Sequence, residues 1–172
     1  MRHCNLKFTF YLSSVYIFFL ILSGCSSYSP TNKIIGKSRT EVIKLLGEPD
    51  PPLNLTKFPS RLDFPRGPAG KHTYFVFFDN KGFAKKFEQV LNQKNFSKIK
   101  PGMTLDEVIF ILGKSKIKTS LGRKRGFFWS YRYENPLCRW FQVEFTENLI
   151  VRSAGISESP DCRGRSRITF SF

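Results

Sequence analysis

Few residues of this 172-residue chain could carry out covalent chemistry, and the four cysteines and two histidines are the first to consider. His3 lies in an N-terminal leader described below, which leaves His72 as the one histidine of the remaining chain. A Ser-His-Asp or Cys-His arrangement would therefore have a single possible base, and we expect His72, near the start of a strand, to be solvated. Because the two spare cysteines are expected to pair with each other, they are not available for a metal cluster. We predict that the protein is not an enzyme and holds neither a metal nor a cofactor.

Cys25 is the residue whose chemistry the sequence indicates most strongly. Arg2 and Lys7 give a positively charged start, residues 8–22 form an apolar run, and Leu22-Ser23-Gly24-Cys25 ends it. This order of charge, apolar core and small residues is typical of a secretory signal. A helix that spans a membrane needs about twenty residues, so the short run argues against a retained anchor.

The four residues that end at Cys25 resemble the bacterial lipobox, in which the thiol takes a diacylglycerol and the chain is cut before it. On that resemblance, residues 1–24 are a removed signal peptide and residues 25–32 a flexible tether. In such lipoproteins a residue other than Asp after the cysteine usually directs the protein to the outer membrane, and Ser26 follows here. We expect a lipid-anchored outer-membrane protein that faces the periplasm.

Cys138 and Cys162 are the two cysteines outside the leader and the lipid site. Export places them in an oxidising compartment, where two spare thiols most simply form a disulfide. We therefore predict a Cys138–Cys162 bond, which would close a loop that includes the last predicted hairpin.

The strong positive charge indicates an anionic partner. Loss of Arg2 and Lys7 with the leader lowers the formal net charge from +15 to +13. Such a charge suggests nucleic acid in a cytosolic protein, but an exported chain meets little of it, and anionic phospholipid fits better. A solvated basic surface is the alternative. The residues expected to contact lipid head groups lie in one predicted loop: Lys114, Lys116, Lys118, Arg123, Lys124 and Arg125.

Aromatic residues alternate along the predicted strand 127–133. Trp129, Tyr131 and Tyr133 share one side of it, and aromatic side chains are frequent at binding hot spots. These three residues are our candidates for partner binding. The alternative is that Trp129 and Tyr131 pack under a helix.

An internal repeat predicts the elements that position these residues. Residues 36–47 align with residues 102–113 at an offset of 66. In both copies a Ser or Thr precedes a Glu by three positions, which is a capping box, and a Gly stands where a left-handed helix end is needed. Each copy is therefore expected to open with a helix. The capping pairs are Ser38 with Glu41 and Thr104 with Glu107, and the terminal glycines are Gly47 and Gly113.

Three strands are expected after each helix, at an offset of 67. Phe141, Val143 and Phe145 repeat Tyr74, Val76 and Phe78 with period two. The turn Asp79–Gly82 leads into the third strand of the first copy, and Thr146–Asn148 does so in the second, with Asn148 in place of Gly at positive φ.

The predicted fold class is α+β, with tandem units of one helix and a three-stranded antiparallel sheet. The expected ranges are 33–91 for the first repeat, 92–156 for the second and 157–172 for a C-terminal tail. The end of that tail, residues 168–172, alternates as an added edge strand would, or it is a mobile end. Whether the two copies share a sheet or a core stays open.

The second copy resembles the SmpA/OmlA (BamE-like) lipoprotein domain family. Its motif here runs from Ser97 to Thr104 and continues with Leu112-Gly113, Trp129-x-Tyr131 and Val143-x-Phe145. The resemblance implies a fold of the BamE or β-lactamase-inhibitor-protein type, barrel-assembly machinery proteins as partners, and a role in outer-membrane protein assembly or envelope integrity. A module that binds or inhibits another envelope protein is the alternative. The family's Gly-x-Pro after the helix is kept as Gly47-Glu48-Pro49 in the first copy but becomes Gly113-Lys114-Ser115 in the second.

Overall fold

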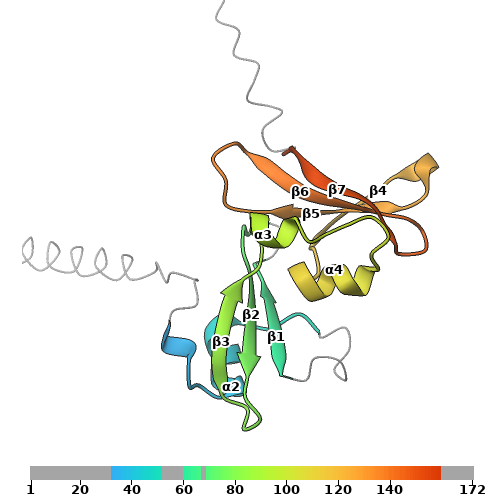
Figure 1. The fold of residues 1–172 in the computed structure, drawn as a ribbon. Coiled ribbons are helices and arrows are strands. Elements are labelled where there is room, and N and C mark those ends of the chain that lie inside the picture. The colour runs from blue at the N-terminus through green and yellow to red at the C-terminus, as the bar shows by residue number, and fades with distance from the viewer. Residues whose placement is uncertain (1–31, 52–59, 67–68, 160–172) are drawn as a thin grey trace, which may run out of the picture.

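The computed structural model of the protein describes residues 32–51, 60–66 and 69–159, and it contains two antiparallel sheets with short helices (Figure 1). The first unit begins with the 3-10 helix η2. Its sheet has the order β1-β2-β3. The elements of this unit are η2 (Asn32–Ile34), α2 (Arg39–Leu46), β1 (Arg61–Pro65), β2 (Thr73–Phe78) and β3 (Ala84–Gln89).

The second unit contains the other sheet, with the order β4-β5-β6-β7. Helices α3 and α4 lie on the same side of this sheet in Figure 1. The elements are α3 (Gln93–Phe96), α4 (Leu105–Leu112), β4 (Ile117–Ser120), η3 (Gly122–Lys124), β5 (Phe127–Arg132), β6 (Arg139–Phe145) and β7 (Val151–Glu158).

The predicted α+β class with antiparallel sheets is confirmed, and the second sheet has one strand more than expected. Residues 117–120 were predicted to belong to a basic loop. In the structure they pair with β5, from Ile117 opposite Ser130 to Ser120 opposite Phe127. Strand formation here satisfies backbone groups that a loop would leave to water.

The two long helices have the predicted caps. The Ser38 hydroxyl accepts from the Glu41 amide, and the Thr104 hydroxyl accepts from the Glu107 amide, while each glutamate accepts from the cap residue's own backbone N–H. These contacts satisfy amide groups that the first turn of a helix leaves without partners. Hydrogen bonds from Ser38 lower the pKa of the Glu41 carboxyl.

The repeat extends to the way each third strand returns to its helix. Gly36 N donates to Ala84 O at 2.7 Å, and at the matching positions Gly102 N donates to Val151 O at 2.9 Å. The positive-φ position of the second turn is Leu149, with φ 62°, which matches Gly82 with φ 83°. The prediction that Asn148 would occupy it is wrong, because the turn hydrogen bonds keep the register of the first copy.

The two units have separate sheets, but part of the first unit belongs to the core of the second. Val42 and Leu46 of α2 pack on Tyr74, Val76 and Phe78 of β2. The other side of β2 contributes Phe75 to the cluster around α4, together with buried residues of the second sheet. The first sheet is therefore covered on both faces.

Candidate functional site on the second sheet

The three aromatic residues predicted to bind a partner are buried. Trp129, Tyr131 and Tyr133 are only 5%, 3% and 6% exposed and belong to the core under α3 and α4. Tyr131 donates to the carbonyl oxygen of Gly113 at 3.0 Å, and burial raises the pKa of its phenol. The prediction of a partner surface at these residues is therefore corrected: they pack under the helices, because this side of β5 faces the apolar stripe of α4.

The opposite face of the second sheet carries a chain of hydrogen bonds between side chains. Gln142 Nε2 donates to Ser130 Oγ at 3.0 Å and Gln142 Oε1 accepts from Ser157 Oγ at 2.7 Å. Glu144 accepts from Ser153 Oγ at 2.9 Å and from Arg152 Nη1 at 2.6 Å. These residues alternate with the core residues of β5 and β6. We call this the outer face, and no described helix or strand lies over it in Figure 1.

Aromatic side chains flank the polar centre of the outer face. Phe128 is half-buried at one end, and Trp140 lies at the other, 8% exposed. The Arg132 guanidinium lies 4.9 Å from the centroid of the Trp140 ring. A polar centre with aromatic and arginine neighbours is a composition common at protein interfaces.

The matching face of the first sheet is occupied. At an offset of 67, Phe75 and Phe77 of β2 correspond to Gln142 and Glu144 of β6. Both phenylalanines pack against the core of the second unit. The same face of the repeated unit is thus a packed interface in one copy, whereas in the other copy it is a polar surface with no described helix or strand over it.

Arg61 joins the two units at that packed interface. Its guanidinium forms an ion pair with Asp63 at 2.7 Å, donates to the carbonyl oxygen of Phe110 at 2.9 Å, and lies 3.9 Å from the centroid of the Phe75 ring. The bond to Phe110 satisfies a carbonyl in the last turn of α4. Burial raises the pKa of Asp63, and the Arg61 charge opposes that shift.

The predicted basic loop is divided by β4. Lys116 pairs with Asp50 of the first unit, and the Lys118 ammonium lies 4.0 Å from the centroid of the Phe127 ring. Lys114 is exposed at the start of this segment. Lysine on an edge strand also discourages pairing with other chains. Lys114, Lys116 and Lys118 therefore lie at one end of an edge strand, and their contact with lipid stays a prediction.

The other three basic residues lie beyond the far end of β4. Arg123 is exposed, and the Arg125 guanidinium reaches Glu147 at 3.9 Å. Lys124 closes η3, and its side chain is not among those described. The six residues thus form two groups rather than one loop.

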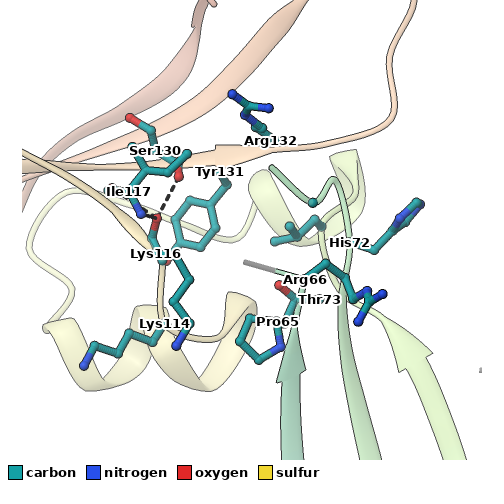
Figure 2. Close-up of a pocket in the computed structure, with 13 residues that line it drawn as sticks. Pro65, Arg66, His72, Thr73, Lys114, Lys116, Ile117, Ser130, Tyr131 and Arg132 are labelled. Atoms are coloured by element: carbon teal, nitrogen blue, oxygen red, sulfur yellow. Dashed lines mark hydrogen bonds between the residues drawn. The ribbon is translucent and has the colours of Figure 1, made fainter. Parts of the chain in front are cut away.

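A shallow polar crevice lies where the units meet, with about 290 Å³ of space that includes open solvent. Figure 2 shows that its basic side chains diverge: Lys114 and Arg132 point away from each other and from Tyr131. The Ser115 hydroxyl fills one wall by donating to the carbonyl oxygen of Ser130 at 2.7 Å and accepting from the Ile117 amide (dashed lines). Burial lowers the pKa of Arg66 at the opposite wall. Diverging cations do not converge on one anionic ligand.

His72 lines this crevice and stacks on Tyr74, with ring centroids 5.8 Å apart. It is half-buried rather than fully solvated. Within residues 32–51, 60–66 and 69–159, no group of three or more His, Cys, Asp or Glu residues could hold a metal ion. Every helix in those ranges is too short or too polar to cross a bilayer.

The cysteine predictions fall largely outside the described residues. The signal peptide (residues 1–24), Cys25, nearly all of the tether, Cys162 and the tail beyond Ser159 lie there. Cys138 is disulfide-bonded. It stands just before β6, where Arg139 pairs with Glu158 near the end of β7. The identity of its partner as Cys162 stays a prediction.

No family model matches the chain, and no curated protein matches it. Among solved structures the chain is similar to a DUF4309 family protein (YjgB) from Bacillus subtilis subsp. subtilis str. 168. The two share 11% sequence identity and a TM-score of 0.31, over 78% of this chain and 86% of that chain. A similarity of this size carries no functional argument.

The expectation that the chain is a member of the SmpA/OmlA family is wrong, since no family model matches the chain. The residues behind that expectation have local structural roles. Thr104 and Gly113 cap α4, and Trp129 and Val143 fill the core. Any unit with a helix on an antiparallel sheet needs residues of these types at such positions.

Proposed function

We propose that the protein is a non-enzymatic lipoprotein of the outer membrane that faces the periplasm and binds another envelope protein through the outer face of its second sheet. One observation carries the binding role. In the first unit the matching face, with Phe75 and Phe77, is covered by a neighbouring folded unit, whereas no described helix or strand lies over the outer face of the second sheet (Figure 1).

The chemistry of the outer face favours a polar partner surface. Glu144 and the Ser130–Gln142–Ser157 chain have hydrogen-bond partners already, so these groups are held in place before a partner arrives. Preorganised side chains lose little entropy on binding. Polar interfaces that retain water are common among non-obligate complexes. We therefore expect reversible binding to a folded protein rather than capture of an apolar segment.

The lipid anchor rests on the sequence around Cys25. A charged start, an apolar run and a small-residue cut site precede it, and the described body begins at Asn32, a few residues later. A body attached so near the membrane meets partners that are themselves held in the envelope. The net positive charge of the protein favours partners whose surfaces are acidic in the region around the binding contact.

Gly155 offers a direct test of the outer face. It pairs with Gln142, is exposed, and a Cβ atom added to it would meet no heavy atom within 4 Å. A photoreactive side chain at position 155 should therefore crosslink the partner in intact envelopes. The control is the same side chain in place of Leu45, which is 54% exposed on α2.

A second experiment tests whether the outer face is required for binding. Gly155→Arg should abolish the complex in detergent extracts while changing the free energy of unfolding by less than about 0.5 kcal/mol. If position 155 yields no protein adduct, or if Gly155→Arg leaves the complex intact, the outer face is not the binding surface.

A further inference from the structure

Two large apolar side chains are exposed where the first unit receives its N-terminal segment. Ile35 and Phe83 are each 44% exposed. They stand beside the same backbone pairing, because Gly36 N donates to Ala84 O at 2.7 Å and Ala84 N donates to Lys37 O at 2.8 Å. The two side chains are thus held on one rigid end of the unit rather than on separate loops.

Three lysines lie within two residues of one or other member of this apolar pair in the sequence. Lys33, Lys81 and Lys85 are exposed, and among the described residues no carboxylate lies within ion-pair distance of any of them. The nearby acid Asp79 is occupied in the turn, where its Oδ1 accepts from the backbone amides of Lys81 and Phe83 at 2.9 Å each. Apolar side chains among exposed lysines are typical of surfaces that rest on anionic lipid.

The chain reaches the first unit from the proposed lipid site at this place. Seven residue steps separate Cys25 from Asn32, which span at most about 25 Å when fully extended. Figure 1 shows the β2–β3 turn at the end of the first unit that is remote from the second sheet. Contact at this end would leave the outer face free for a partner.

We infer that the end of the first unit formed by Ile35, Phe83, Lys33, Lys81 and Lys85 docks on the anionic phospholipid surface to which the chain is tethered. This membrane-docking patch rests on the proposed lipid anchor. Ile35 and Phe83 enter the head-group region, and the three ammonium groups contact phosphate. The tether keeps the patch at high local concentration near the bilayer, so a modest intrinsic affinity is sufficient.

The β4 edge is a weaker candidate for the same contact. Lys116 is paired with Asp50 across the unit junction, and Lys118 covers an aromatic ring. These side chains already have partners within the protein. The edge also belongs to the second unit, whereas the tether enters the first.

The test uses the full chain in its own envelope, with a photoreactive phenylalanine derivative in place of Phe83. Leu149 is the matched control, because it lies in the corresponding turn of the second unit and is 45% exposed. After irradiation, mass spectrometry measures phospholipid adducts at each position. The mass of the peptide that carries Cys25 is recorded in the same sample and reports lipidation separately.

We expect at least about tenfold more phospholipid adduct at position 83 than at position 149. Each lysine near an anionic membrane strengthens binding about fivefold, so Lys33→Glu/Lys81→Glu/Lys85→Glu should reduce the adduct at position 83 at least about tenfold. The triple variant Lys114→Glu/Lys118→Glu/Arg123→Glu, with the same change in charge, should not reduce it.

Equal adducts at positions 83 and 149, or equal loss in the two triple variants, would overturn the docking patch even when Cys25 carries lipid. A Cys25 peptide without lipid would instead overturn the proposed anchor, whatever position 83 contacts. The two failures are therefore distinguishable.

Discussion

Arg61→Leu should destabilise the protein by about 3–5 kcal/mol, the usual cost of removing one partner of a buried ion pair. The Arg61 side chain is 7% exposed and that of Asp63 is 17% exposed, so little water is available to replace the lost contacts. The substitution leaves the Asp63 carboxylate buried without its cation and the Phe110 carbonyl without its donor.

The double variant Arg61→Leu/Asp63→Leu is the informative companion. Well-packed apolar residues in place of a buried ion pair often cost little, so the double variant should recover the part of the loss caused by the unpaired carboxylate. It should stay about 1–3 kcal/mol less stable than the original protein, because the bond from Arg61 to the Phe110 carbonyl is still missing. Urea unfolding of the full chain, followed by circular dichroism, gives both values. The account is refuted if Arg61→Leu costs less than about 1 kcal/mol, or if the double variant is no more stable than the single one.

The same variants predict a pH dependence. Burial raises the pKa of Asp63, so folding favours the protonated carboxyl, and its contribution to stability falls as pH rises from its unfolded pKa through its folded pKa. Loss of Arg61 removes the charge that opposes this shift. The stability deficit of Arg61→Leu should therefore shrink as pH falls below the pKa of Asp63 in the variant, and a deficit that does not change with pH would contradict this cause.

Two further predictions concern the repeat and the core. Leu149→Gly should stabilise the protein by about 0.5–1 kcal/mol, because relief of the positive φ outweighs the added chain entropy of the unfolded state. Gly82→Leu at the matching turn should destabilise the protein by about 1–2 kcal/mol. Thermal unfolding of both variants checks the two signs, and a Leu149→Gly variant less stable than the original protein would show that Leu149 is not strained. Tyr131→Phe should cost about 1–2 kcal/mol in urea unfolding, because the Gly113 carbonyl loses its buried donor; a cost near zero would show that another group satisfies that carbonyl.

The helices were predictable because their signals are local. Ser38 and Thr104 each cap a helix whose start depends on residues within one turn. The sheet pairings followed from period-two patterns and from the repeat, since each copy supports the other. Strand β4 has neither support: its four residues contain one large apolar side chain, have no counterpart strand in the first copy, and become a strand by pairing with β5.

The sequence contains a signal for the position of the outer face. Residues 73–78 are apolar at nearly every position, which is typical of a strand covered on both faces. Residues 139–145 alternate instead, with Gln142 and Glu144 between apolar neighbours. Aromatic content drew attention to Trp129 and Tyr131, although alternation alone placed them on the packed side.

The difference between the two copies also accounts for the polarity of the outer face. A chain that carries an apolar face like that of Phe75 and Phe77 twice would have to cover it twice, or associate with other molecules through the exposed copy. Gln142 and Glu144 at the matching positions remove that risk and keep the face hydrogen-bonded without a partner. A surface built in this way can be left free in solution and still be occupied when a complementary polar protein is close. Tethering supplies that closeness, so the binding strength required of the face itself is small.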